Sequence, residues 1–286
     1  MSRAEIGIIG GSGLYQMAGV DDVSWHAVET PFGAPSDEVA IGRIAGVSVA
    51  FLSRHGRGHR VAPHEINYRA NIWALKSLGV KWLISVSAVG SMREEIVPGD
   101  LVMVDQFIDR TRMRHSTFFE DGIAGHVSFA DPVCGILQGA LSGTAADLGI
   151  THHDGGTYVC IDGPQFSTRA ESLLYRSWGV SVVGMTNLPE ARLAREAQIA
   201  YATIALATDY DCWHESEEEV SVEAVLATVR GNVDKAQRVI QRVVPELVDA
   251  GPSAAWSSLT HAIMTATDAI GEGAQERLAL LLADIT

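Results

Sequence analysis

Apolar segments of strand length alternate with amphipathic segments of helix length over most of this 286-residue chain. The clearest segment is YATIALAT at 201–208, which predicts a buried strand because it is apolar along its whole length. Regular alternation of the two kinds of segment favours an α/β fold in which helices cover both faces of one sheet. We therefore predict a three-layer α/β sandwich.

The predicted strands share an apolar run bounded by glycine or polar residues, and they are 6–9, 39–44, 47–52, 82–86, 101–107, 157–161, 180–183 and 201–208. The predicted helices have an apolar face, and they are 63–78, 133–148, 168–178, 190–197, 220–248 and 259–285, the last with a short break at Gly271. Residues 113–131 have no clear period and predict a long loop, of the kind that is usually functional or at an interface. No second-domain signature interrupts the pattern, so we expect one domain over 1–286 with a helical C-terminal segment from about 253.

Composition excludes several classes of function. Hydrophobic residues make up 47% of the chain, which is enough for a globular core. The net charge of −14 disfavours nucleic acids and anionic membranes as partners, although a local cluster of donors can still hold a small anion. No apolar run approaches the length of a membrane span. Three scattered cysteines indicate a reduced, cytoplasmic protein without disulfides.

Polar side chains recur at the carboxyl ends of the predicted strands. Ligands of open α/β sheets bind outside these ends. We therefore expect one composite site, built from residues that each follow a different strand. They are Ser12, Arg54, Ser87, Thr186 and Asp209.

Two of these strand ends suit an anion. The glycine-rich turn 10–13 exposes backbone N–H groups, but it matches neither the dinucleotide fingerprint nor the P-loop. The run 53–60, SRHGRGHR, places three arginines and two histidines among glycines, which favours close approach of an anion. His55, His59 and His64 do not predict a metal site, because no cysteine or acid is spaced to complete a ligand set.

The strand 201–208 ends in Asp209 and Asp211, with Tyr210 between them. Both carboxylates can face one pocket if the chain turns at Tyr210, whereas they alternate if the strand continues. Two solvated acids would be the simpler interpretation of an isolated Asp-x-Asp. The polar residues at the other strand ends favour a ligand site instead.

Six segments in order carry a family resemblance: IGIIGGSGLY, SRHGRGHR with PHEINYRANIWALK, SAVGSMREEIVPGDLVMVDQFIDRT, DGPQFSTRAE, GMTNLPEARLAREA and ATDYDCWH. Together they resemble the trimeric purine nucleoside phosphorylases, and most closely the branch that acts on 5'-methylthioadenosine. The resemblance spans residues 5 to 250, and the C-terminal tail matches weakly. It implies a central mixed β-sheet flanked by helices, a homotrimer, and inorganic phosphate as co-substrate with no metal or organic cofactor.

The resemblance also implies roles for individual residues. The phosphate site comprises Ser12, Arg54, His55, Ser87, the backbone of Ala88, and Thr186. The nucleoside site comprises Phe166 against the purine, Met185 at the ribose, and Asp209, Tyr210 and Asp211 at the base edge. The positions tied to substrate choice are Ser167, Val222 and Val225 of the 5' pocket, and His126 contributed by a neighbouring subunit.

The chain departs from the family pattern at a few positions. Ser12 and Ser87 stand where well-known relatives carry threonine, and the hydroxyl is retained. Asp162 and Gln165 replace the usual Glu and Arg, and Asn187 replaces a small residue. These three changes could loosen specificity for the base or the nucleoside.

The two aspartates fit a 6-aminopurine. One carboxylate can accept from the N6 amino group, and the other, if protonated, can donate to N7 as the base leaves. Two neighbouring carboxylates raise one pKa, which keeps a proton available near neutral pH. We expect Asp209 to meet N7, while the sequence leaves Asp211 open for the same role.

The function implied is phosphorolysis of S-methyl-5'-thioadenosine to adenine and 5-methylthioribose 1-phosphate, in purine and methionine salvage. One alternative is a phosphorylase of methylthioinosine or other purine nucleosides. A more distant alternative is a non-catalytic protein that binds nucleosides or phosphate. An ionised aspartate facing O6 would set acceptor against acceptor, so the aspartate pair argues against 6-oxopurines.

Overall fold

The computed structural model describes residues 3–11, 17–214 and 222–283, and of residues 222–227 it describes only the backbone. The strands are β1 (Ile6–Gly10), β2 (Val20–His26), β3 (Val39–Ile44), β4 (Val47–Ser53), β5 (Trp82–Ser91), β6 (Leu101–Met103), β7 (Gln106–Asp109), β8 (His152–Asp154), β9 (Thr157–Cys160), β10 (Val182–Gly184) and β11 (Ala200–Asp209). The α-helices are α1 (Tyr68–Ser77), α2 (Gly135–Asp147), α3 (Arg169–Ser177), α4 (Asn187–Glu196), α5 (Val222–Leu247) and α6 (Glu272–Leu282). Short 3-10 turns occupy Pro63–Glu65, Asp211–Trp213, Ala254–Ser257 and Thr267–Ala269.

The sheet is organised around β5. Within the described residues the strand order is β2-β3-β4-β1-β5-β10-β9-β7, with β11 beside β5 and β6, and β8 beside β6. β5 pairs in parallel with β1 and with β11, whereas its C-terminal end pairs antiparallel with β10. The sheet is therefore mixed, and the carboxyl ends of β1, β5 and β11 point the same way.

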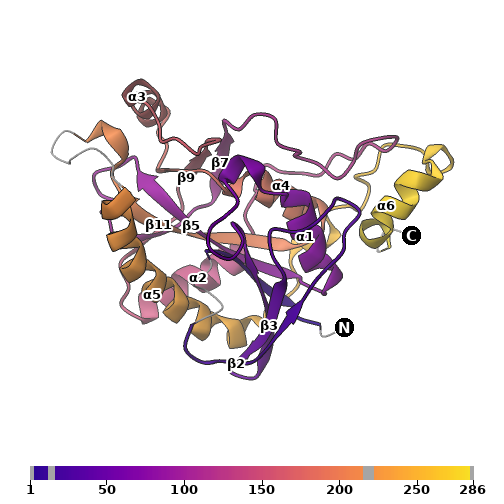
Figure 1. Cartoon of the computed structure of the whole chain (residues 1–286), viewed down its shortest axis with the longest axis horizontal. Helices are drawn as coiled ribbons and strands as arrows, with labels where there is room; N and C mark the ends of the chain where they lie inside the picture. The colour runs from indigo at the N-terminus through magenta and orange to yellow at the C-terminus, as the bar shows by residue number, and fades with distance from the viewer. Residues whose placement is uncertain (1–2, 12–16, 215–221, 284–286) are drawn as a thin grey trace.

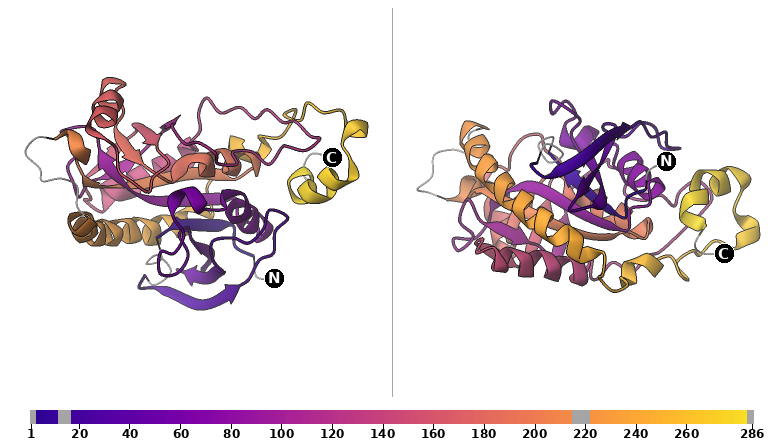
Figure 2. Two further views of the ribbon diagram at one scale, coloured as in Figure 1. Left: turned by 45° about the horizontal axis from the view of Figure 1, so that its top comes forward. Right: turned by 90° about the horizontal axis from the view of Figure 1, so that it is seen from below.

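Two apolar cores lie on opposite faces of the sheet. Along β11, Tyr201 and Ala205 belong to one core, while Ile204 and Leu206 belong to the other, as the two-residue period of a strand requires. Helices α1 and α4 cover the first face, and α2 and α5 lie side by side on the second (Figures 1 and 2). The predicted three-layer sandwich is confirmed.

The predicted elements differ from the structure mainly at sheet edges and element ends. The strand predicted at 82–86 continues to Ser91, and the strand predicted at 101–107 divides into β6 and β7. Strands β2 and β8 were not predicted, because neither contains the apolar run by which strands were identified. β2 is largely exposed, and β8 consists of three polar residues. The predicted helix 63–78 begins only at Tyr68, where the side chain of Asn67 accepts from the N–H of Ala70 and caps it.

The helix predicted over 259–285 is wrong for its first half. Residues near Ile263 instead run beside the long segment 113–131 and form a β-bridge between Gly125 and Ile263. The N–H of His126 donates to Ala262, and the N–H of Met264 donates to Ala124. Between 259 and 283 the described chain forms the 3-10 turn Thr267–Ala269 and then α6, and the two segments reach away from the sheet together (Figure 1).

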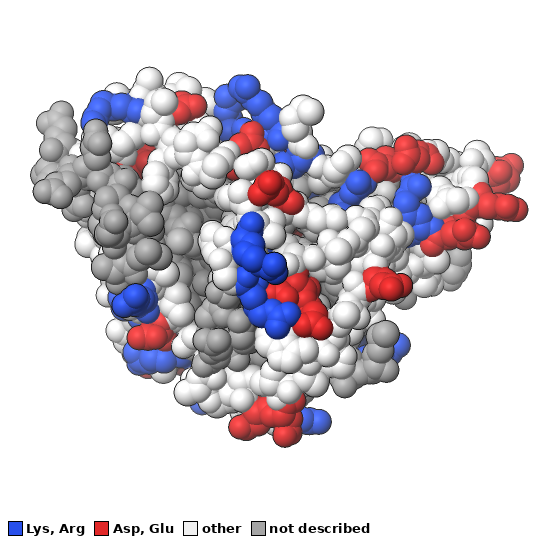
Figure 3. Space-filling view, viewed as in Figure 1, with Lys and Arg blue, Asp and Glu red and all other residues white. Residues whose placement is uncertain are grey.

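Figure 3 shows the charged side chains on one face of the molecule. On the face drawn in Figure 3, basic side chains lie among acidic ones. No helix in the described ranges is both long and apolar enough to cross a membrane.

The long segment 113–131 is fixed to the core by one buried carboxylate. Glu196, at the end of α4, accepts from Thr117 Oγ1 at 2.8 Å and from the N–H of Phe118 at 2.7 Å. Burial raises the pKa of Glu196 to about 7, although both hydrogen bonds act in the opposite direction. Loss of the proton from Glu196 therefore opposes folding.

The raised pKa of Glu196 predicts a pH-dependent stability. A carboxyl whose folded pKa lies above its unfolded value stabilises fully below pH 4.5 and loses that contribution as the pH rises through about 7. We expect the free energy of unfolding of the wild type, relative to Glu196→Gln, to fall by at most about 1.4 kcal/mol per pH unit in this window. Urea unfolding between pH 4.5 and 8 measures it. The exposed variant Glu276→Gln controls for the loss of a surface carboxyl. A flat difference between the wild type and Glu196→Gln would contradict the prediction.

Candidate active site

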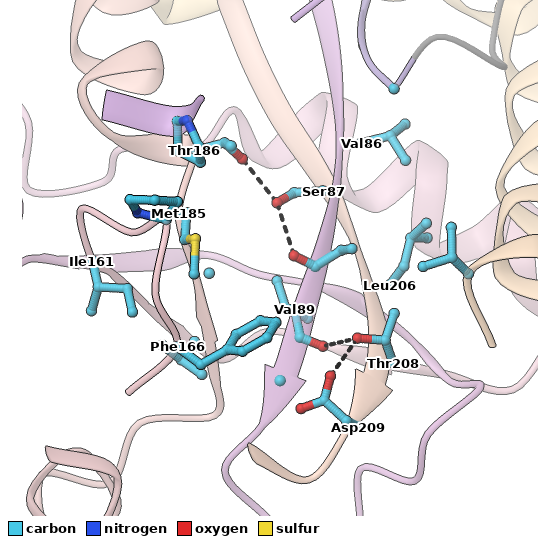
Figure 4. A pocket seen from close by; sticks show the side chains of 18 of the residues that line it. Val86, Ser87, Val89, Ile161, Phe166, Met185, Thr186, Leu206, Thr208 and Asp209 are labelled. Carbon is cyan, nitrogen blue, oxygen red and sulfur yellow. Dashed lines mark hydrogen bonds between the residues drawn. The ribbon is translucent and has the colours of Figure 1, made fainter. Parts of the chain in front are cut away.

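A cavity of about 450 Å³ lies where the carboxyl ends of β4, β5, β10 and β11 meet. It brings together most of the predicted site residues: Arg54, His55, Ser87, Ala88, Phe166, Ser167, Met185, Thr186, Asp209 and Asp211. Figure 4 shows hydroxyls at one end of the cavity and Asp209 at the other, with apolar side chains between them. The cavity therefore has a donor-rich end and an acidic end.

Hydroxyl groups line the donor-rich end. Ser87 Oγ lies 2.9 Å from Thr186 Oγ1 and 3.3 Å from the hydroxyl of Tyr158. The Tyr158 hydroxyl also accepts from the N–H of Thr186, and burial raises the pKa of Tyr158 to about 12, so it stays protonated. Gly184 permits this approach, because a Cβ there would lie 2.0 Å from the Tyr158 oxygen.

Arg54 reaches this end as a fully buried cation. Its Nε donates to Glu190 Oε2 at 2.6 Å, and its Nη2 donates to Glu190 Oε1 at 2.9 Å. Burial acts to lower the pKa of Arg54, but the Glu190 carboxylate outweighs burial and keeps that pKa above its ordinary value. Nη1 donates to the carbonyl of Val86, so the guanidinium plane is fixed beside the middle of β5. The side chain is thus a permanently charged and rigid part of the cavity wall.

His55 is held as a neutral ring. Its Nδ1 lies 2.9 Å from the carbonyl of Val61, which can only accept, so Nδ1 carries the hydrogen. Burial, reinforced by the charge of Arg54, lowers the pKa of His55 to about 4. The ring also stacks on His59 at 4.2 Å between centroids. Its Nε2 is therefore an acceptor near neutral pH, suited to an acidic O–H of a bound anion.

The acidic end depends on a β-bulge in β11. Ala207 pairs with Val89 of β5 and Asp209 pairs with Gly90, so Thr208 is an extra residue between them. A bulge breaks the alternation of side chains, and both Thr208 and Asp209 line the cavity as a result. The chain then turns at Tyr210, and Asp211 adopts a positive φ of 52°. Both carboxylates consequently face one pocket.

The two carboxyl groups have different surroundings. Asp209 Oδ1 accepts from the N–H of Asp211 at 2.8 Å, and Asp209 Oδ2 lies 2.6 Å from Thr208 Oγ1. Asp211 is buried, and burial raises its pKa above the ordinary value, while a negative charge on Asp209, when that carboxyl is ionised, raises it further. Which of the two carboxyl groups carries a proton to a ligand stays a prediction.

Apolar side chains form the walls between the two ends. Phe166, 46% exposed, stands at the mouth of the cavity, and Met185 faces it from the loop after β10 (Figure 4). Val229 and Val233 of α5 close the opposite wall. A flat aromatic ligand with a small apolar extension would fit between these surfaces.

A model of the phosphorylase superfamily matches residues 5–245. Among curated relatives, the S-methyl-5'-thioadenosine phosphorylase of Geobacter sulfurreducens is 58% identical over 278 residues, covering 97% of each chain. The protein of the same name from Thermosynechococcus vestitus is 55% identical and covers 98% of each chain. The chain belongs to the phosphorylase superfamily.

Solved structures agree with this membership. A methylthioadenosine phosphorylase from an antarctic soil metagenomic library is 50% identical, with a TM-score of 0.95 over 99% of this chain and 100% of that one. The Schistosoma mansoni methylthioadenosine phosphorylase in complex with adenine is 34% identical, with a TM-score of 0.84 over 99% of both chains. This member of the superfamily thus shares its complete fold with enzymes named for methylthioadenosine.

Some predicted site residues of this phosphorylase-superfamily chain do not line its own cavity. Tyr210 donates its hydroxyl to the carbonyl of Glu94 and stacks on His214. His126 lies in the segment paired with Ala262, away from the cavity residues. Ser12 and the side chains of Val222 and Val225 lie outside the described residues.

The departures from the family pattern also have defined places. Asn187 is buried behind the cavity, where its side-chain N–H group donates to Ser85 and to Tyr201. Asp162 accepts from the N–H of Arg112, and with Gln165 it lines a second, polar pocket next to Phe166. Asn187 therefore supports the Arg54 region rather than the base.

Two functional residues had no clear sequence signal. In the sequence Glu190 is only the first residue of the predicted helix 190–197, although a carboxylate in an apolar helical pattern can indicate a buried ion pair. Arg114 donates to the carbonyls of Met185 and Leu188 at 2.9 and 2.7 Å, and to that of Asp162 at 2.9 Å. It thereby joins the loops after β9 and β10 that carry the cavity wall.

The side chains in the described ranges bear on whether the chain holds a metal ion. No group of three or more His, Cys, Asp or Glu side chains there is arranged to hold a metal ion. That the chain needs no metal or organic cofactor stays a prediction.

Removal of the Glu190 charge should affect stability and anion binding together. Glu190→Gln leaves Arg54 buried without its counter-charge, which costs roughly 3–5 kcal/mol. We expect this loss in the free energy of urea unfolding, together with a raised KM for phosphate because the guanidinium is no longer fixed.

An exposed ion pair supplies the matched control. Glu5 contacts Lys81 at 3.0 Å with both side chains at least half exposed, so Glu5→Gln should cost only about 0–1 kcal/mol. Equal losses for the two variants would contradict the assigned role of Glu190.

Proposed function

We propose that this chain is an S-methyl-5'-thioadenosine phosphorylase. It converts S-methyl-5'-thioadenosine and inorganic phosphate to adenine and 5-methylthioribose 1-phosphate. The observation that carries the proposal is the single cavity, in which a hydroxyl and arginine cluster lies opposite a pair of aspartates. The relatives at 50–58% identity over nearly their whole length carry the same name.

Phosphate occupies the donor-rich end. Ser87, Thr186 and the backbone N–H of Ala88 donate to its oxygens, and Arg54 supplies the positive charge. Neutral His55 accepts from a phosphate O–H through Nε2, which turns a charged oxygen towards the sugar. Ser12 follows the cavity-lining Gly11 and completes the set.

The purine occupies the acidic end. Phe166 lies against its ring, where an aromatic side chain gains most from stacking. The C1'–N9 bond breaks and its electron pair moves onto the purine, while a proton from the aspartate pair adds to N7. A phosphate oxygen then bonds to C1', and its negative charge stabilises the oxocarbenium-like transition state.

The aspartate pair selects a 6-aminopurine. An ionised carboxylate accepts from the N6 amino group, whereas it would repel the O6 carbonyl of a 6-oxopurine. A site built to bond an amino group discriminates strongly against an analogue that lacks it. Adenine is therefore the expected base.

The pocket for the 5' methylthio group is formed by α5 together with a residue from a neighbouring subunit. Val229 and Val233 supply an apolar wall on α5, and Val222 and Val225 precede them at helical spacing and contact the methylthio group. His126 enters the same pocket from a neighbouring subunit of a homotrimer. Its position beside Ala262, away from its own cavity, supports this arrangement.

The proposed reaction implies a role in salvage and a location in the cell. Both products are salvageable, adenine as a purine and the sugar phosphate as a source of methionine. Cys134, Cys160 and Cys212 form no disulfide, which supports a reduced, cytoplasmic location. The proposed reaction needs phosphate as co-substrate and no other cofactor.

Base release tests the proposal directly. Purified protein is incubated with S-methyl-5'-thioadenosine with and without phosphate, beside methylthioinosine and inosine. We expect phosphate-dependent release of adenine and little hypoxanthine. Asp209→Asn and Asp211→Asn should each lower kcat/KM by about 100-fold or more, because proton transfer and N6 recognition are lost.

The alternatives give different results. Preferential release of hypoxanthine would retain the phosphorylase chemistry but overturn the assigned base. Binding of nucleoside with no phosphate-dependent turnover would indicate a non-catalytic binding protein.

A further inference from the structure

The bulge residue Thr208 touches the proposed proton donor directly. Its hydroxyl lies 2.6 Å from Asp209 Oδ2 and 3.1 Å from the carbonyl oxygen of Val89 on β5. Figure 4 shows the three groups in a row, from the β5 carbonyl through the hydroxyl to the carboxyl. Thr208 is buried, and Asp209 is partly buried where it lines the cavity.

The count of hydrogens in this row is decisive. A threonine hydroxyl has one hydrogen, and the carbonyl of Val89 has none to give. When Thr208 donates to Val89, the short contact to Asp209 is a hydrogen bond only if the carboxyl supplies its own hydrogen. When Asp209 is ionised, Thr208 must turn to it, and its bond to Val89 is lost. A protonated Asp209 therefore satisfies both contacts, and an ionised one satisfies a single contact.

The other oxygen of Asp209 agrees with this assignment. Oδ1 accepts from the N–H of Asp211 at 2.8 Å, so a hydrogen on that oxygen would oppose the bond. The carboxyl hydrogen therefore belongs on Oδ2, next to Thr208.

We propose that Thr208 is a positioning residue that holds the proton on Asp209 in the resting site and stabilises the carboxylate once that proton has moved to the purine. The stabilisation of the carboxylate after proton transfer rests on the proposed phosphorolysis, whereas the holding of the proton in the resting site does not. During the proton transfer, the Oδ2–H bond of Asp209 breaks as the N7–H bond forms. The hydroxyl then rotates from Val89 to donate to the new carboxylate, and no other reactant is needed.

Several other groups near the pair also titrate. Asp211 follows on the same turn, and its charge acts on the neighbouring thiol of Cys212 and on Tyr175 of α3. Arg169 of α3 donates to the carbonyl of Cys212. Because none of these groups is changed by a substitution at Thr208, they contribute equally to the wild type and its variants.

Two substitutions separate the hydroxyl from the shape of the side chain. Thr208→Val keeps the branched shape and removes the hydroxyl, whereas Thr208→Ser keeps the hydroxyl. Infrared difference spectra of the ligand-free protein at neutral pH report the C=O stretch of protonated carboxyls. Asp209→Asn identifies the band of Asp209 by its loss.

The resting-state result does not depend on any substrate. We expect the Asp209 band in the wild type and in Thr208→Ser, and a shift to higher frequency in Thr208→Val, because the carboxyl hydrogen loses its acceptor. The proposal would be overturned if no carboxyl band were lost in Asp209→Asn. It would also be overturned if the frequency of the Asp209 band were the same in Thr208→Val as in the wild type.

Kinetic measurements test whether Thr208 acts on Asp209 during the reaction. With S-methyl-5'-thioadenosine, Thr208→Val should lower kcat by about tenfold, the effect of one lost charge-assisted hydrogen bond, while KM for phosphate stays within about twofold. The alkaline limb of the kcat profile should move to lower pH, because the protonated carboxyl loses the acceptor that holds its hydrogen. A purely structural role would lower kcat in Thr208→Val without moving the limb.

The outcomes also separate this inference from the proposed function. If the band behaves as expected but the wild type releases no adenine, the proposed function fails and the proton-holding role is upheld. If adenine is released but the limb and kcat of Thr208→Val equal those of the wild type, the function stands and the role of Thr208 is wrong.

Discussion

The buried pair of Arg54 and Glu190 joins the parts of the molecule that form the site. Arg54 follows β4, and Glu190 belongs to α4 on the face of the sheet covered by α1. Ser85 of β5 and Tyr201 of β11 both donate to the same Glu190 oxygen, so four elements meet at one carboxylate. A buried charge is costly unless it is fully paired, which makes every one of these positions depend on the others. The guanidinium of Arg54, which faces the cavity, is consequently held in one fixed orientation.

The two aspartates at the acidic end of the cavity are positioned by the β-bulge in β11. β5 and β11 pair in parallel over most of their length, and the register shifts only at Thr208. This one extra residue turns Asp209 towards the cavity, while the positive φ of Asp211 brings the second carboxylate round to the same side. Rigid donors at one end and a proton-bearing pair at the other lie on neighbouring strands, so a nucleoside and an anion between them are aligned by the sheet itself.

The sequence could predict the positions that follow from periodicity. Arg54 and Asp209 were found because the carboxyl ends of parallel strands converge on one edge, and the alternation of strand-length and helix-length segments predicted the layers. Ser87 and Thr186 reach the same site by other routes, since Ser87 lies inside the longer β5 and Thr186 follows β10, which runs antiparallel to β5. The bulge at Thr208 could not be found, because it exists only in the pairing of two strands that are distant in sequence. Pairing with a distant segment also replaced the helix expected near 263, where the bridge to Gly125 outweighs a local helical pattern. Glu190 and Arg114 were missed for the same reason, since their partners lie far away in the chain.

The central claim is that phosphate and purine bind at opposite ends of one cavity, with the sugar between them. A crystal structure of the protein with S-methyl-5'-thioadenosine, and with sulfate in place of phosphate, tests it most directly. We predict sulfate oxygens within hydrogen-bond distance of Ser87 Oγ and the Thr186 side chain, and the N6 and N7 edge of the adenine facing Asp209 and Asp211. Sulfate bound away from Arg54, or an adenine edge turned from both aspartates, would contradict the account.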